Sequence, residues 1–134
     1  MAIILLAFGC GDPKLPPIKS ALEDPNGSFH LFISNQSFAI TPVDIQVSID
    51  GIPVVQKDFE VGDQHNWQGF VFKLASGQHK IVVTSLKGKA TLEKTFEMPD
   101  KLSGVLDYWY YPKGEGGTPR SFSFEVLKGP VGFM

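Results

Sequence analysis

Residues 43–50 limit the possible fold more than any other stretch of this chain. Apolar residues take every second position in it: Val43, Ile45, Val47 and Ile49. Alternation with a period of two predicts a β-strand that has one buried and one solvent-facing side, whereas a helix would scatter these side chains around its circumference. The stretch ends at Asp50-Gly51, residue types that tolerate the positive φ of a tight turn between antiparallel strands. It therefore predicts a β-hairpin.

The same strand pattern recurs along most of the chain. Strands are expected over residues 29–34, 43–50, 54–61, 67–74, 79–86, 90–98, 105–111 and 121–127. Within them we expect these side chains to point inward: Phe59, Val61, Phe70, Phe72, Leu74, Leu92, Phe96, Met98, Phe122, Phe124 and Val126. Short strands at this spacing predict an all-β protein, an antiparallel sandwich of about seven or eight strands. The acidic Asp44 falls on the solvent-facing side of its strand.

Composition supports one β-rich domain and argues against some functions. A chain of 134 residues is long enough for one core and short for two. Fourteen glycines and ten prolines suit many turns. The formal charge of −2 offers no basic face for nucleic acid. Because Cys10 is the single cysteine, no intramolecular disulfide can form, and stability must come from burial.

Two segments carry a resemblance to known modules. Val47-Ser48-Ile49-Asp50-Gly51 and Leu74-Ala75-Ser76-Gly77-Gln78-His79-Lys80-Ile81-Val82-Val83 resemble the immunoglobulin-like and PEGA-like modules of bacterial surface proteins. The resemblance implies an immunoglobulin-like sandwich over residues 29–134. These modules are mostly non-catalytic and present surfaces to partners, so it also implies an interaction role.

The N-terminus begins with an apolar run, residues 2–8, which is too short to cross a bilayer because a spanning helix needs roughly twenty residues. It fits a buried edge strand, the remainder of a secretory signal or a lipoprotein signal. Leu6-Ala7-Phe8-Gly9-Cys10 resembles the bacterial lipobox, although Ala7 stands where leucine is usual and no basic residue precedes the run. The resemblance implies a signal segment over residues 1–10 and a lipid on Cys10.

Residues 11–28 are rich in proline and lack periodicity. Such segments favour extended conformations that separate a domain from its anchor. We therefore expect a tether and an extracytoplasmic, membrane-anchored domain at the cell envelope. The alternative is an ordered N-terminal arm in which the Cys10 thiol is buried and inert.

The densest candidate site is Tyr108-Trp109-Tyr110-Tyr111. In a strand, Asp107 shares a side with Trp109 and Tyr111, and burying a charge is costly, so we expect this side to face solvent. Exposed aromatic rings suit a protein partner or a sugar ring. Trp67 is a further candidate for the rim of this site. The alternative is that the rings cover a sheet edge or pack on the N-terminal arm, and that Trp67 merely begins a strand.

Metal and cofactor sites are not indicated. The histidines at positions 30, 65 and 79 lack metal-ligand spacing. The glycine-rich residues 114–117 lack the Lys-Ser/Thr ending and following helix of a phosphate loop. We predict neither a metal nor a cofactor.

No catalytic residues are indicated either, because no serine lies in a nucleophile elbow and Cys10 lies in the expected anchor. The sequence therefore predicts a non-catalytic binding or scaffolding module that contacts a protein or glycan. One alternative is a carbohydrate-binding module. Another is a small hydrolase that uses Asp107 and Glu125 on adjacent strands.

Overall fold

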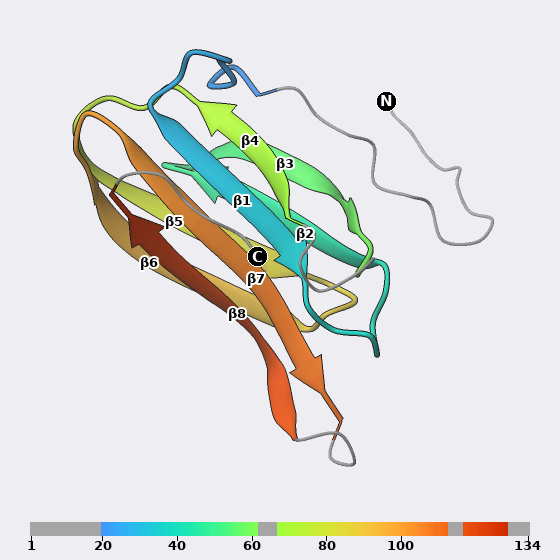
Figure 1. The fold of residues 1–134 in the computed structure, drawn as a ribbon. Coiled ribbons are helices and arrows are strands. Elements are labelled where there is room, and N and C mark those ends of the chain that lie inside the picture. The colour runs from blue at the N-terminus through green and yellow to red at the C-terminus, as the bar shows by residue number, and fades with distance from the viewer. Residues whose placement is uncertain (1–19, 62–66, 113–116, 129–134) are drawn as a thin grey trace, which may run out of the picture.

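The computed structural model describes residues 20–61, 67–112 and 117–128, which form two packed β-sheets (Figure 1). The eight strands are β1 (Phe29–Asn35), β2 (Val43–Ile49), β3 (Ile52–Phe59), β4 (Gln68–Phe72), β5 (Gly77–Ser85), β6 (Ala90–Met98), β7 (Leu102–Tyr111) and β8 (Thr118–Leu127). The predicted all-β sandwich of about eight strands is confirmed.

Each sheet has four strands. One has the order β4-β1-β7-β8 and the other the order β3-β2-β5-β6. Neighbouring strands are antiparallel, as predicted, except that β1 and β7 are parallel. Parallel neighbours need a long crossover connection, and here the strands of the other sheet lie between them in the chain. The period-two pattern does not distinguish parallel from antiparallel neighbours.

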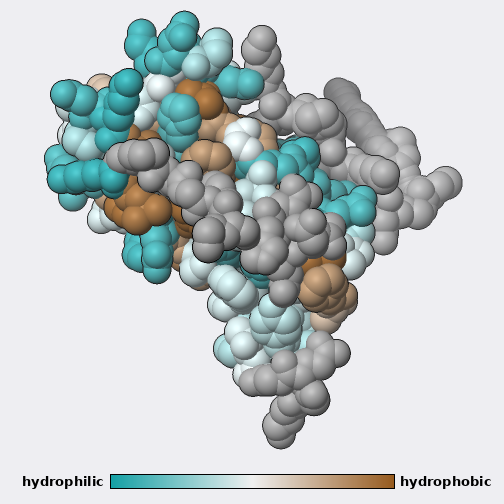
Figure 2. Space-filling view, in the orientation of Figure 1, coloured by the Kyte–Doolittle hydropathy of each residue, from teal (hydrophilic) through white to brown (hydrophobic). Residues whose placement is uncertain are grey.

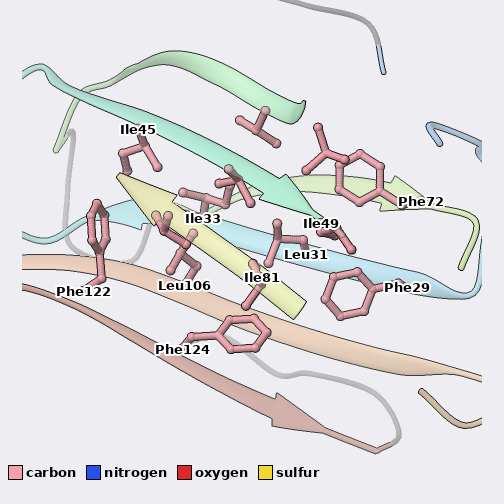
Figure 3. Close-up of a cluster of buried hydrophobic side chains, with 14 of the residues drawn as sticks. Phe29, Leu31, Ile33, Ile45, Ile49, Phe72, Ile81, Leu106, Phe122 and Phe124 are labelled. Carbon is pink, nitrogen blue, oxygen red and sulfur yellow. The ribbon is translucent and has the colours of Figure 1, made fainter. Parts of the chain in front are cut away.

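The inward sides of the two sheets share one hydrophobic core (Figure 3). Phe29 of one sheet stacks on Phe96 of the other, with ring centroids 5.1 Å apart. The expected inward positions are buried or packed against this core, with one exception. Val126 is 40% exposed, because it lies near the end of the edge strand β8, beside the edge of the other sheet.

The turn after β2 has the predicted geometry, since Asp50 and Gly51 both have positive φ, 52° and 81°. The expectation for Asp44 is wrong, because this side chain is only 5% exposed. Its carboxylate accepts hydrogen bonds from the Ser85 hydroxyl and from the backbone N–H groups of Leu86 and Lys87, each at 2.8 Å. The turn after β5 folds over Asp44 and thereby removes it from solvent.

Residues 20–28 lie against the edge strand β4. The N–H of Asp24 donates to the carbonyl of Val71 at 3.1 Å, and the N–H of Lys73 donates to the carbonyl of Leu22 at 2.8 Å. Cys10 and the rest of the expected signal segment lie outside the described residues. The described part of the chain contains no helix that is long and apolar enough to cross a lipid bilayer.

Candidate functional site

The three predicted binding residues lie on the outer side of the sheet β4-β1-β7-β8. Trp109 and Tyr111 alternate along β7 with the buried Tyr108, so they point away from the core. Trp67 directly precedes β4 and reaches the same side, where its indole Nε1 donates to Asp107 Oδ1 at 2.7 Å. We call Trp67, Asp107, Trp109 and Tyr111 the aromatic face.

Asp107 is the residue around which this face is built. It was expected to face solvent, but it is only 8% exposed. Ser34, its partner in the neighbouring strand β1, donates its hydroxyl to Asp107 Oδ1 at 2.5 Å, and Trp67 supplies a second donor. Hydrogen bonds to both neighbours make burial of the carboxyl group tolerable.

The surroundings of Asp107 disfavour its charged form. Burial raises the pKa of this carboxyl, and the negative charge of Glu125 acts in the same direction, whereas the hydrogen bonds from Ser34 and Trp67 oppose them. Burial prevails, so the pKa lies above the ordinary aspartate value of 3.8. The outer side of the sheet thus holds a partly water-excluded carboxyl that is hydrogen-bonded to the Trp67 indole.

Trp109 and Tyr111 lie at the end of the β7–β8 hairpin that projects beyond the other strands (Figure 1). Their ring centroids are 6.5 Å apart and their planes are inclined by 50°. Both side chains are partly exposed. In the space-filling view the projecting end is pale, the colour of intermediate hydropathy, whereas strongly hydrophobic residues gather near the tip of β8 (Figure 2).

The polar atoms of these rings are bonded within the protein. The indole Nε1 of Trp109 donates to the Ser123 hydroxyl at 2.8 Å, and the Tyr111 hydroxyl donates to the carbonyl of Gln36 at 2.9 Å. These bonds hold the rings at set angles, and the groups that remain for a partner are mainly aromatic carbon atoms. Rings held in advance lose less conformational entropy on binding.

Asp107 and Glu125 lie on neighbouring strands, as expected. Asp107 is opposite Ser123 in the β7–β8 register, so Glu125 is its diagonal neighbour on the same side of the sheet. Diagonal neighbours are roughly 7–8 Å apart. Glu125 is exposed, whereas Asp107 is buried and already accepts two hydrogen bonds.

His79 makes polar contacts with other described residues, and it lies in β5 of the other sheet. His79 Nδ1 lies 2.5 Å from Asp50 Oδ2, and Nε2 lies 2.7 Å from the carbonyl oxygen of Ala75. His65 lies outside the described residues. Within the described ranges, no group of three or more His, Cys, Asp or Glu side chains is placed to hold a metal ion.

Sequence reasoning missed the polar residues that support the face. Gln36 is 4% exposed and donates through Nε2 to the Ser34 hydroxyl at 2.8 Å, which extends the network from Asp107. The sequence signal was the acidic residue itself, since Asp107 interrupts the otherwise apolar and aromatic run of residues 105–111. Its partners come from β1 and from the segment before β4, and no local pattern identifies them.

Comparisons of this chain with protein-family models, with curated proteins and with solved structures found no match.

Proposed function

We propose that this protein is a non-catalytic binding or scaffolding module that contacts a protein partner through the aromatic face. The observation that carries the proposal is Trp109, a partly exposed indole held by Ser123 beside Tyr111 on a projecting hairpin. Aromatic residues dominate the binding energy of many protein interfaces because they offer a large contact area at low entropic cost.

A protein partner is favoured over a sugar by the angle between the rings. The C–H face of a sugar stacks best on coplanar aromatic rings, whereas the planes of Trp109 and Tyr111 are inclined by 50°. Their hydrogen-bonding atoms are also engaged within the protein, which leaves few polar groups to recognise sugar hydroxyls. A carbohydrate-binding module remains the second candidate, supported by the nearby carboxyl groups of Asp107 and Glu125.

The test compares wild-type protein with Trp109→Ala. Each is immobilised and used to capture proteins from an envelope extract of the host, and the captured partner is then purified and titrated by calorimetry. We expect Trp109→Ala to weaken binding about thirtyfold, as for an interface residue worth roughly 2 kcal/mol. The melting temperature should change by only a few degrees, since the ring lies outside the core.

The matched control is Ile52→Ala, which removes an exposed apolar side chain from the other sheet. This variant should bind like wild type. Unchanged binding by Trp109→Ala would refute the proposal, and a large fall in its melting temperature would assign the ring to the folded core. A glycan array tests the second candidate, a carbohydrate-binding module. Glycan binding that is abolished by Trp109→Ala would show that the aromatic face binds a sugar rather than a protein.

Catalysis by the strand carboxylates is the remaining alternative. Diagonal placement of Asp107 and Glu125 and the raised pKa of Asp107 favour it. Glycoside hydrolysis that is lost in Glu125→Gln would make the protein a hydrolase. We expect no such activity, because Asp107 is buried and both Ser34 and Trp67 donate hydrogen bonds to its Oδ1 atom.

We also propose that the domain works at the cell envelope, anchored by a lipid on Cys10. Residues 20–28, the described part of the expected tether, lie against β4. The lipobox resemblance of residues 6–10 supports this location. Mass spectrometry of the N-terminus of protein taken from its own host is the test. A diacylated or triacylated Cys10 would support the anchor, and an unmodified Met1 in the cytosolic fraction would overturn it.

A further inference from the structure

A second surface lies on the other side of the projecting hairpin. It is a concavity of about 490 Å³ between the turn that joins β5 to β6 and the start of β8. Arg120 and Lys89 line it, Phe122 contributes a largely buried ring, and Leu86 stands beside them. We call this surface the basic groove. It shares no lining residue with the aromatic face.

The cations of the groove lack acidic partners among the described residues. The ion pairs among the described residues join His79 to Asp50 and Lys80 to Glu93. Neither Arg120 nor Lys89 takes part in one. The nearest buried acid of this turn, Asp44, already accepts hydrogen bonds from Ser85, Leu86 and Lys87. Arg120 and Lys89 therefore form no ion pair with the described residues, and their side chains remain available to an acidic ligand.

The groove is also held in shape. The guanidinium carbon of Arg120 lies 4.4 Å from the centroid of the Tyr110 ring, a cation–π contact that orients the charged group. On the opposite wall, Lys89 follows Gly88, whose carbonyl accepts a hydrogen bond from the Tyr108 hydroxyl at 2.7 Å. A planar guanidinium held in this way suits two-point binding of a carboxylate.

Apolar and backbone groups accompany the charges. Leu86 is 85% exposed, so its side chain is available for an apolar contact. Both β6 and β8 are edge strands, and an edge strand can pair its backbone groups with an extended peptide. A small anion would use the charges alone, whereas a peptide would use the charges, Leu86 and the strand edge.

From charge complementarity and this edge geometry, we propose that the basic groove binds an extended acidic segment of a protein partner, with carboxylates on Arg120 and Lys89 and an apolar side chain on Leu86. A membrane surface is less well matched, because the two cations line a hollow between sheet edges. This site is independent of the aromatic face, and its test does not require the partner proposed above.

The probe is a fluorescein-labelled peptide of alternating glutamate and valine, titrated by fluorescence anisotropy at low ionic strength. A second peptide carries glutamine in place of glutamate. We expect Arg120→Gln and Lys89→Asn each to weaken binding of the glutamate peptide about fivefold to tenfold. Asparagine is chosen at position 89 because Lys89 has a φ of 49°, and asparagine tolerates positive φ. Binding should weaken as salt is added.

Lys101→Gln is the matched control, because it removes the same charge from an exposed residue at the opposite end of β7. It should bind like wild type, and so should Trp109→Ala, which tests the aromatic face alone. Equal binding of the glutamine peptide, equal loss in Lys101→Gln, or no binding of the glutamate peptide would each overturn the proposal. The proposal would also be overturned if the protein sedimented with phosphatidylserine vesicles, if Arg120→Gln and Lys89→Asn abolished this sedimentation, and if the glutamate peptide did not bind.

Discussion

At the scale of single residues, Asp107 shows how a charge enters a folded sheet. One oxygen atom of this carboxyl accepts hydrogen bonds from Ser34 and Trp67, and burial raises its pKa. Two effects therefore oppose each other: the hydrogen bonds stabilise the fold, and desolvation of the charge destabilises it. Substitutions that separate charge from hydrogen bonding can measure each effect.

We expect Asp107→Asn to preserve or increase the free energy of unfolding at neutral pH, because the amide oxygen still accepts both bonds and no charge is buried. Asp107→Ala should lower it by about 1–3 kcal/mol, because the Trp67 and Ser34 donors lose their acceptor. Urea denaturation measures both variants. Equal loss in the two would show that the charge itself, rather than hydrogen bonding, stabilises this face.

The stability difference between wild type and Asp107→Asn should also depend on pH. Since the folded pKa of Asp107 is raised, its contribution to stability is complete below the unfolded value and is lost as pH rises through the folded value. The difference in unfolding free energy between wild type and Asp107→Asn should therefore become less favourable to wild type as pH rises above about 4.

At the scale of elements, the turn between β2 and β3 is tied to a third strand. Asp50 accepts a hydrogen bond from the N–H of Lys80 at 2.9 Å and pairs with His79, both in β5. Burial alone would lower the pKa of His79, but the hydrogen bonds to Ala75 and Asp50 and the charges of Asp50 and Glu97 outweigh it and raise the pKa above 6.5.

A raised pKa means that His79 binds its proton more tightly in the folded state than in the unfolded state, so protonation stabilises the fold. We expect this contribution to be complete below pH 6.5, the ordinary value, and to disappear as pH rises through the folded pKa. The change should be modest, below about 1 kcal/mol, because the Asp50 side chain is 44% exposed and solvent screens an ion pair with an exposed partner. Thermal unfolding across this pH range is the measurement.

The control for this turn is Asp50→Asn. Asparagine accepts the φ of 52° at this position and can still accept the hydrogen bond from the N–H of Lys80, but it carries no charge. The pH dependence of stability near neutrality should therefore shrink in this variant. A pH profile identical to that of wild type would assign the dependence to other groups.

At the scale of the whole molecule, the two sheets are joined by polar contacts as well as by the core. Tyr108 is fully buried, belongs to one sheet, and donates its hydroxyl to the carbonyl of Gly88 in a turn of the other sheet. The same turn folds over Asp44. Close approach of the Tyr108 ring requires glycine at position 88, where a Cβ would lie 2.8 Å from the ring.

We expect Gly88→Ala to lower the free energy of unfolding by about 1–3 kcal/mol, the usual cost of overpacking. Gly69→Ala is the matched control, because its Cβ would meet only the end of the Phe32 ring, at 3.3 Å, and it should change stability much less. Chemical denaturation compares the two. Wild-type stability in Gly88→Ala would show that the turn can move away from Tyr108.

Local sequence by itself determined the strands, the inward side chains other than Val126, and the turn at Asp50-Gly51, because period-two burial and positive φ are properties of neighbouring residues. It also put Trp109 and Tyr111 on one side of their strand. Only the tertiary structure decided the parallel pairing of β1 with β7 and the burial of Asp44 and Asp107. Those outcomes depend on residues distant in the chain, such as Ser34 and Trp67, which supply the hydrogen bonds that no local pattern encodes.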